Sequence, residues 1–347
     1  MGKQGIHTAL LSAILFGISP VACKAMTGEM PPALLAGLLY LGSGLGLAGV
    51  VLRQRTPVFT ALHSLSGRQW LHLGGAIVSG GVLAPLFLAY GIRFGSATEV
   101  SLLLNFEAVA TTLLAWLVFH EYVGMRVWAG KLLIVGASVL IVLSGSGGTT
   151  LSLPGLAVLA ACCLWGIDNN LTRELESLPA TLLACLKGLS AGLFNILLAR
   201  LLSSESGSAL QVTAALGIGA LSYGVSLVLF IHALREIGAA RTSTWFATGP
   251  FIGTLLSVLL LGERPPEAYW LAALIMLSGI LFLYGERHRH PHTHNPLEHN
   301  HQHTHDKHHR HAHDERDISG PHEHHHCHEP LTHTHVHWPD IHHRHSH

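Results

Sequence analysis

The amino-acid sequence predicts an all-α integral membrane protein with ten transmembrane helices, arranged as two inverted five-helix repeats and followed by a disordered tail. Only 12% of the 347 residues are charged and the mean hydropathy is +0.41, whereas an average soluble domain is about 25% charged. Apolar stretches of the length that spans a bilayer, about 20 residues, recur throughout residues 1–285. Residues 286–347 instead hold all but five of the 29 histidines.

The apolar stretches must be helices, because lipid offers no partner to unpaired backbone groups. Proline and glycine clusters such as Pro31-Pro32 and Pro265-Pro266 separate them. The predicted spans are 8–26, 33–52, 70–92, 97–119, 127–144, 153–172, 180–202, 210–234, 241–261 and 268–284.

The distribution of Lys and Arg among the short loops predicts the orientation. A cytoplasmic N-terminus places nine of these residues inside: Lys3, Arg53, Arg55, Arg68, Arg126, Arg173, Arg235, Arg241 and Arg287. The outside loops then receive Arg93 and Arg264. We therefore expect a multi-pass protein of the inner or plasma membrane with both termini in the cytoplasm; one miscounted span would move the tail outside.

Motifs of the first half recur in the second, 142–149 residues later. Phe16-Gly17 with Lys24 corresponds to Trp165-Gly166 with Arg173, Gly95-x-Ala97 to Gly238-x-Ala240, and Glu121 with Trp128 to Glu263 with Trp270. A unit of this length holds five helices, and because five is odd the second copy must be inverted. The expected domains are two five-helix repeats, 1–145 and 150–285, and a tail, 286–347. Inverted repeats are typical of secondary transporters.

These motifs, with Leu102-Leu103-Leu104-Asn105-Phe106-Glu107-Ala108-Val109, resemble those of the drug/metabolite transporter superfamily, and most closely its EamA-type branch. The resemblance covers about residues 8–285. It implies two inverted five-helix repeats around a central substrate cavity, and usually the efflux of small metabolites. It does not identify the substrate, and the tail is not part of the family pattern.

Small residues at GxxxG spacing let helices approach closely in lipid. They occur at Gly42/Gly46, Gly188/Gly192 and Gly249/Gly253. Packing within one bundle is the favoured interpretation, and a homodimer interface is the alternative.

Polar groups inside the apolar segments are the candidate substrate- and proton-binding residues, because such groups are costly in lipid and commonly face a cavity. They are Glu107, Asp168, Asn169, Lys187 and Asn195. Glu107 would exchange a proton or contact substrate, or alternatively hold helices together. The run Asp168-Asn169-Asn170 indicates cavity exposure or helix unwinding, unless Arg173 neutralises Asp168. Lys187 would share a cavity-facing stripe with Asn195, or extend to the membrane interface.

Other polar residues have structural interpretations. Asn105 is expected to form hydrogen bonds between helices rather than to share the face of Glu107. Lys24 is expected to anchor a helix end. Glu121 and Glu263 are expected to bind nearby backbone or arginine groups where their helices end.

The tail predicts transition-metal binding, because neutral imidazole is a good ligand for Ni, Zn, Co and Cu. Its low apolar content predicts disorder in the absence of metal. The candidate ligands are His288, His290, His292, His294, His299, His301, His303, His305, His322, His324, His325, His326, Cys327, His328, His333, His335 and His337. Such sites would be labile and suited to buffering, sensing or delivery, and no cofactor is expected to be required.

Three functions remain open. The first is a secondary transporter of a transition metal or a metal-chelating metabolite, with the tail gathering or sensing the ion. The second is an exporter of amino acids or other metabolites with an incidental tail. The third is a membrane metal sensor that transports nothing. No motif for ATP hydrolysis or other catalysis is found, so an enzyme is not expected. A formal net charge of zero gives no reason to expect a nucleic-acid partner; the expected partners are the lipid bilayer and the cargo.

Overall fold

The structure is a computed structural model that describes residues 2–27, 30–55, 58–119, 123–144, 152–203, 207–283, 288–294, 297–303, 322–328 and 331–337. The chain divides into two compact units: a helical unit, which contains the described residues up to 283, and a tail unit, which contains those from 288 to 337.

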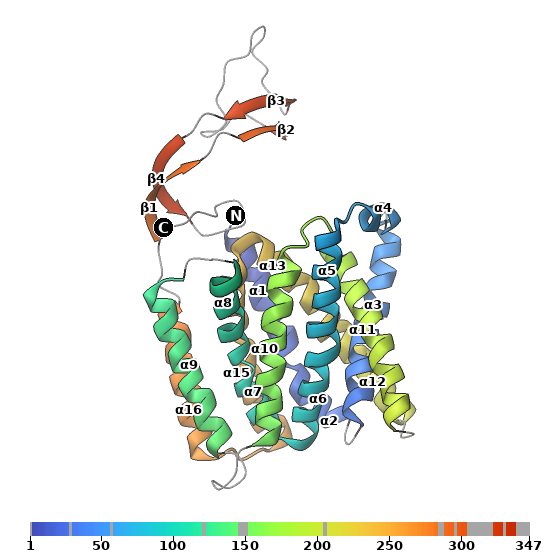
Figure 1. Ribbon diagram of the computed structural model, residues 1–347. Helices are drawn as coiled ribbons and strands as arrows, with labels where there is room; N and C mark the ends of the chain where they lie inside the picture. The colour runs from blue at the N-terminus through green and yellow to red at the C-terminus, as the bar shows by residue number, and fades with distance from the viewer. Residues whose placement is uncertain are drawn as a thin grey trace. The chain divides into compact units, whose positions relative to one another are not determined.

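The helical unit is a bundle of helices that run back and forth beside one another (Figure 1). Its first half contains α1 (Gly2–Gly17), α2 (Ser19–Thr27), α3 (Pro32–Arg53), α4 (Val58–His63), α5 (Gly67–Ala76), the π-helix η1 (Ile77–Leu83), α6 (Ala84–Phe94), α7 (Ala97–Leu103), α8 (Phe106–Phe119) and α9 (Met125–Ser144). Its second half contains α10 (Leu153–Arg173), α11 (Ala180–Leu202), α12 (Ala209–Ile218), the π-helix η3 (Gly219–Val225), α13 (Ser226–Ile237), α14 (Ala239–Phe246), α15 (Gly249–Leu261) and α16 (Glu267–Leu283).

Helices form where the apolar stretches predicted them. Among the described residues, eight helical segments are long and apolar enough to cross a membrane, two fewer than the ten predicted spans. The other two predicted spans correspond to α10 and α16. Helix α16 is apolar but shorter, and α10 has 21 residues but ends near the polar run Asp168-Asn169-Asn170. The chain is therefore a multi-pass membrane protein.

Helical geometry changes at matching places in the two halves. The seven-residue π-helices η1 and η3 follow α5 and α12. The residues Leu104-Asn105 separate α7 from α8, and Ala247-Thr248 separate α14 from α15. Changes of this kind release backbone carbonyls from the regular helical pattern and often occur at functional sites.

The core of the helical unit joins its two halves. Helix α3 packs along α11 and α9 along α16, while α10 contacts α6 and α8, and α1 contacts α13, α14 and α15. Glycines permit the closest approaches: a Cβ atom at Gly42, Gly188 or Gly249 would collide with backbone of a neighbouring helix in the same chain. The expected packing of the GxxxG residues within one bundle is confirmed for these positions.

The tail unit contains four strands, where the sequence predicted disorder. Strand β1 (His288–His294) pairs antiparallel with β4 (Leu331–His337), and β2 (Leu297–His303) pairs antiparallel with β3 (His322–His328). In register, His290 lies opposite His335 and His301 opposite His324. Alternating sequences have the two-residue period of a strand and can pair through backbone hydrogen bonds. Disorder of the tail in the absence of metal stays a prediction.

Candidate functional site

A cavity lies between helices of both halves of the helical unit. Its empty volume is about 430 Å³, including space open to solvent. Its walls are formed by α1, α3, α8, α10, η3, α13 and α14. The lining residues are Phe16, Tyr40, Glu107, Trp165, Asp168, Asn169, Ser222, Tyr223, Ser226, Leu227, Phe230 and Phe246.

Aromatic side chains form a connected wall of this cavity. The Phe16 ring forms T-shaped contacts with Trp165 and Tyr223 at centroid distances of 5.7 and 5.6 Å, and its centroid lies 5.2 Å from that of Phe246. Tyr40 extends the wall, 5.6 Å from Tyr223. Phe16 and Trp165 are the first residues of the two corresponding sequence motifs, so the motifs meet at the cavity.

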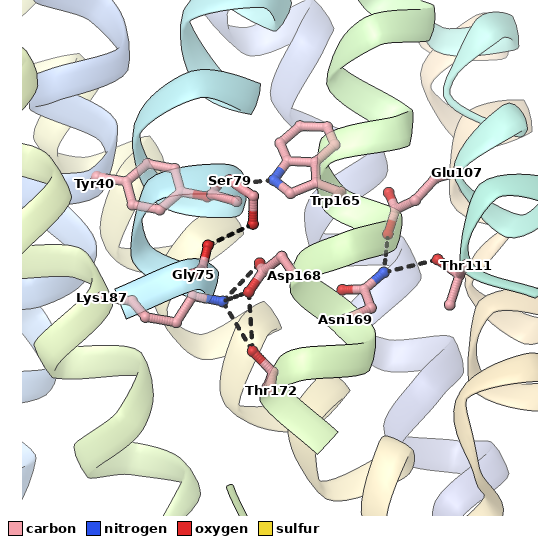
Figure 2. A network of polar contacts seen from close by, with 11 residues as sticks. Tyr40, Gly75, Ser79, Glu107, Thr111, Trp165, Asp168, Asn169, Thr172 and Lys187 are labelled. Atoms are coloured by element: carbon pink, nitrogen blue, oxygen red, sulfur yellow. Dashed lines mark hydrogen bonds and ion pairs between the residues drawn. The ribbon is translucent and has the colours of Figure 1, made fainter. Parts of the chain in front are cut away.

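Glu107 reaches the cavity from the first turn of α8, directly after the break at Leu104-Asn105. Its side chain is buried, and Oε1 accepts a 2.8 Å hydrogen bond from Nδ2 of Asn169. The same nitrogen donates to Oγ1 of Thr111 at 3.1 Å (Figure 2). Within the described part of the chain, no Lys, Arg or His lies within ion-pair distance of Glu107.

Asp168 forms a buried ion pair with Lys187. The Lys187 Nζ atom lies 2.6 Å from Oδ1 and 2.7 Å from Oδ2, and donates a longer bond of 3.3 Å to Thr172 Oγ1. Thr172 donates in turn to Oδ1 of Asp168 at 2.9 Å. The two charged side chains are 4% and 1% exposed, so the charges of the pair offset each other away from water.

The structure decides three points that the sequence left open around this pair. Lys187 supplies the cation beside Asp168, a role for which the sequence suggested Arg173. The interfacial alternative for Lys187 is wrong, because its side chain is buried. Helix unwinding at Asp168-Asn169-Asn170 is also wrong, because α10 continues through Arg173; the break in the helix lies instead between α7 and α8.

The carbonyl oxygen of Gly80 in η1 accepts hydrogen bonds from two residues that line the cavity. It accepts hydrogen bonds from Tyr40 Oη at 2.5 Å and from Trp165 Nε1 at 3.1 Å. Figure 2 shows both rings converging on this segment, next to the Asp168–Lys187 pair. A Cβ atom at Gly80 would overlap the Asp168 carboxylate, so the contact requires glycine.

The sequence explains why the Gly80 carbonyl is available. In η1 the hydrogen bonds run from residue i+5 back to residue i, as from the Ala84 N–H to the Ser79 carbonyl. The next donor in this series would be residue 85, which is a proline and has no N–H. Pro85 therefore frees the carbonyl that Tyr40 and Trp165 use.

Asn195 does not line the cavity. Its Nδ2 atom donates to the carbonyl oxygens of Gly81 and Val82 in η1, at 3.3 and 3.5 Å. Lys187 also lies outside the set of lining residues. The predicted stripe of Lys187 and Asn195 along α11 thus faces η1 and α10 rather than the cavity, and both residues support its wall.

Three other polar residues have the structural contacts expected of them. Asn105 bonds to the Leu102 carbonyl and to Met276 Sδ of α16. Lys24 donates to the carbonyls of Ile92, Arg93 and Gly95 at the end of α6. Glu263 accepts from the backbone N–H groups of Ala97 and Thr98 at 2.8 Å each, at the start of α7. Glu121 lies outside the described residues.

Sequence reasoning missed the aromatic wall and one buried cation. Phe16 and Trp165 were used only as markers of the repeat, although an aromatic residue at the same position in both copies was a usable signal. Lys131 in α9 is 1% exposed, and its Nζ atom has no hydrogen-bond partner among the described residues. No group of three or more His, Cys, Asp or Glu side chains suited to a metal ion occurs in the part of the chain searched, the described residues.

The fold and the site define a helical membrane protein with a polar and aromatic cavity between its two halves, an arrangement common among secondary transporters. The EamA-like transporter family model matches residues 3–143 and 153–285. These ranges cover more than half of the chain, which therefore belongs to that family.

Several known proteins are similar along most of the chain. An "Uncharacterized transporter" of Methanothermobacter thermautotrophicus is 25% identical, over 81% of this chain and 86% of its own. A "Probable amino-acid metabolite efflux pump" of Escherichia coli is 27% identical, over 80% and 93%. A solved crystal structure with 18% identity has a TM-score of 0.65 and covers 81% of this chain and 95% of its own, a likeness of fold alone.

Proposed function

We propose that the chain is a secondary transporter that exports a small organic solute across the inner or plasma membrane. The observation that carries the proposal is the cavity between the two halves, with the Glu107 carboxyl group in its wall. The family and the efflux pumps among the similar proteins support transport and its outward direction. The predicted topology, with both termini in the cytoplasm, follows from the Lys and Arg distribution.

The transport mechanism that we propose is alternating access by two inverted five-helix repeats, residues 1–145 and 150–285. Matching π-helices and helix breaks, and the contact of Phe16 with Trp165, support a repeat whose symmetry axis passes near the cavity. In such transporters the halves rock about a site near the bilayer midplane. The seam of α3 with α11 is a surface along which this movement would occur.

Glu107 is the group that we propose to couple transport to protons. It is buried in the cavity wall with one amide partner, so it can change protonation without breaking an ion pair. The matched test compares Glu107→Gln with Glu99→Gln. Glu99 is also buried in the predicted fourth span, but bonds to Ser152 and lies outside the cavity lining. Proton-driven efflux should disappear in the first variant only; equal efflux by both would contradict the coupling role.

For the tail, residues 286–347, we propose labile binding of Ni, Zn, Co or Cu on the cytoplasmic side. Alternating histidines support it, as does the register, which sets His288 opposite His337 and His299 opposite His326. Residues directly opposite in a ladder have Cβ atoms about 4.5–5.5 Å apart. The cavity itself favours an organic cargo, including a metal chelate, over a bare ion, because the described residues hold no metal cluster.

One comparison tests the transport proposal and the role of the tail. Metal and metabolite contents are measured in cells that produce the intact chain, the chain truncated after Gly285, or no chain. Transport predicts that at least one small metabolite is depleted from cells with the intact chain, and identical metabolite profiles would refute it. A tail that serves transport predicts an altered Ni, Co, Zn or Cu content after truncation. Unchanged metal contents would favour an exporter with an incidental tail, and an effect on metals without any efflux would favour the sensor.

A further inference from the structure

The carboxylate of Glu107 is the one charge of the cavity wall that no described cation offsets. Two acidic residues, Glu107 and Asp168, line the cavity. Asp168 is neutralised by Lys187, with both carboxylate oxygens within 2.7 Å of the ammonium nitrogen. Among the described residues, the Glu107 carboxylate has only the amide of Asn169 as a partner. When Glu107 is ionised, the cavity therefore has one uncompensated negative charge.

The ammonium and amide donors beside the cavity are already engaged. Lysine has three N–H donors, and Lys187 directs contacts to both Asp168 oxygens and to Thr172. Both donors of the Asn169 amide are used, on Glu107 and Thr111. No Lys, Arg or His is among the described residues that line the cavity. A solute carboxylate would find no free charged donor there.

The hydroxyl groups and the indole N–H of the wall add few free donors. Tyr40 Oη and Trp165 Nε1 both donate to the Gly80 carbonyl, and Ser226 Oγ donates to the Ser12 carbonyl at 3.0 Å. The hydroxyl groups of Ser222 and Tyr223 remain, and these accept as well as donate. The wall thus offers acceptors to an incoming solute, above all the second oxygen of Glu107.

The aromatic wall suits the same class of solute. Phe16 lies within 5.7 Å, centroid to centroid, of Trp165, Tyr223 and Phe246, and Phe246 borders a second recess that Glu107 also lines. Ring faces attract organic cations within about 6 Å and also pack against apolar groups. Rings that line the same cavity as a carboxylate form a site for an ammonium group attached to an apolar body.

We infer that the cavity selects small monovalent organic cations, amines or quaternary ammonium compounds with an apolar body, over zwitterions, anions and bare metal ions. The inference rests on the proposed transport function and names its substrate class. It departs from the amino-acid metabolites named for two of the similar proteins, because a zwitterion brings a carboxylate that the described wall does not match.

Three probes that share one phenyl ring test the inference: 2-phenylethylamine, L-phenylalanine and 3-phenylpropionate. Binding to the purified full-length chain is measured by calorimetric titration in detergent at neutral pH, with a chelator present to keep metals off the tail. 3-Phenylpropionate has no ammonium group for Glu107, and the carboxylate of L-phenylalanine would be buried without a charged donor, which is costly. The amine should therefore bind roughly tenfold to a hundredfold more tightly than either of the other two probes. Equal or tighter binding of either carboxylate-bearing probe, or no binding of the amine, would overturn the inference.

Variants then locate the preference. Glu107→Gln, which keeps an oxygen for Asn169, should abolish the preference for the amine, while Glu99→Gln should retain it. If the Glu107 variant does not fold, the order of the three probes' affinities for the unmodified chain still tests the inference. A preference that survives Glu107→Gln in a folded protein would contradict the assignment.

Transport of the same probes in proteoliposomes separates this inference from the proposed function. Preferential movement of L-phenylalanine would leave the transporter intact and refute the substrate class. Selective binding of the amine without movement of any probe would support the substrate class and count against transport.

Discussion

Replacing Asp168 by Asn should strongly destabilise the helical unit, because the Lys187 ammonium would remain buried without its counter-ion. Both partners are almost inaccessible, at 4% and 1% exposure. Removing one member of a buried pair costs about 3–5 kcal/mol. For a large domain, where each kcal/mol shifts the melting temperature by about 2 °C, the expected fall is roughly 6–10 °C.

The assay is thermal unfolding of the detergent-purified chain, followed by intrinsic fluorescence, for a double-mutant cycle. The second variant is Lys187→Met, and the third combines both changes. The combination should recover most of the loss, because it buries no charge. Glu176→Gln, at an exposed carboxylate beyond the end of α10, is the control and should change stability by less than about 0.5 kcal/mol. A single variant as stable as the unmodified chain, or a combination as unstable as the sum of its parts, would refute the reasoning.

Variants at three further positions test other parts of the structure in the same assay. Lys131→Met should raise stability by about 1–3 kcal/mol, since it removes a buried amine that has no hydrogen-bond partner among the described residues; a lower melting temperature would indicate a missed partner. Gly80→Ala should lower the free energy of unfolding by about 1–3 kcal/mol, because the added Cβ would overlap Asp168, and it should also weaken amine binding. Unchanged stability and binding would mean that η1 shifts at little cost to make room for the Cβ. Glu263→Ala should cost about 0.5–2 kcal/mol through loss of the α7 cap, whereas Glu263→Gln should lose less, and equal losses would argue against capping.

Part of the candidate site followed from the sequence. Glu107, Asp168 and Asn169 were identified because polar groups within apolar stretches are costly in lipid, and all three line the cavity. Lys187 was identified by the same argument, but its partner was not, because the side chains of α10 and α11 meet only through packing. Asn195 was assigned to the cavity because its position along α11 matched that of Lys187; the structure turns it to the η1 carbonyls.

The role of Gly80 and the contact of Tyr40 with Tyr223 were beyond sequence reasoning. A proline five residues after a glycine frees a carbonyl only if the backbone between them adopts π-helical geometry, and the apolar pattern of residues 77–85 does not distinguish a π-helix from an α-helix. Similarly, Tyr40 and Tyr223 lie in different halves of the chain, and only the packing of α3 against η3 brings them together.

The sequence by itself determined the class of the protein, the positions of its apolar helices and the residues that mark its two halves. These properties depend on the composition and the hydrophobic period of each segment, because every span must satisfy its own backbone hydrogen bonds within the lipid. The tertiary structure alone decided which polar groups are neutralised. A carboxyl group has the same chemistry at positions 107 and 168, and only the extension of the Lys187 side chain from α11 to α10 gives one of them a cation and leaves the other with an amide.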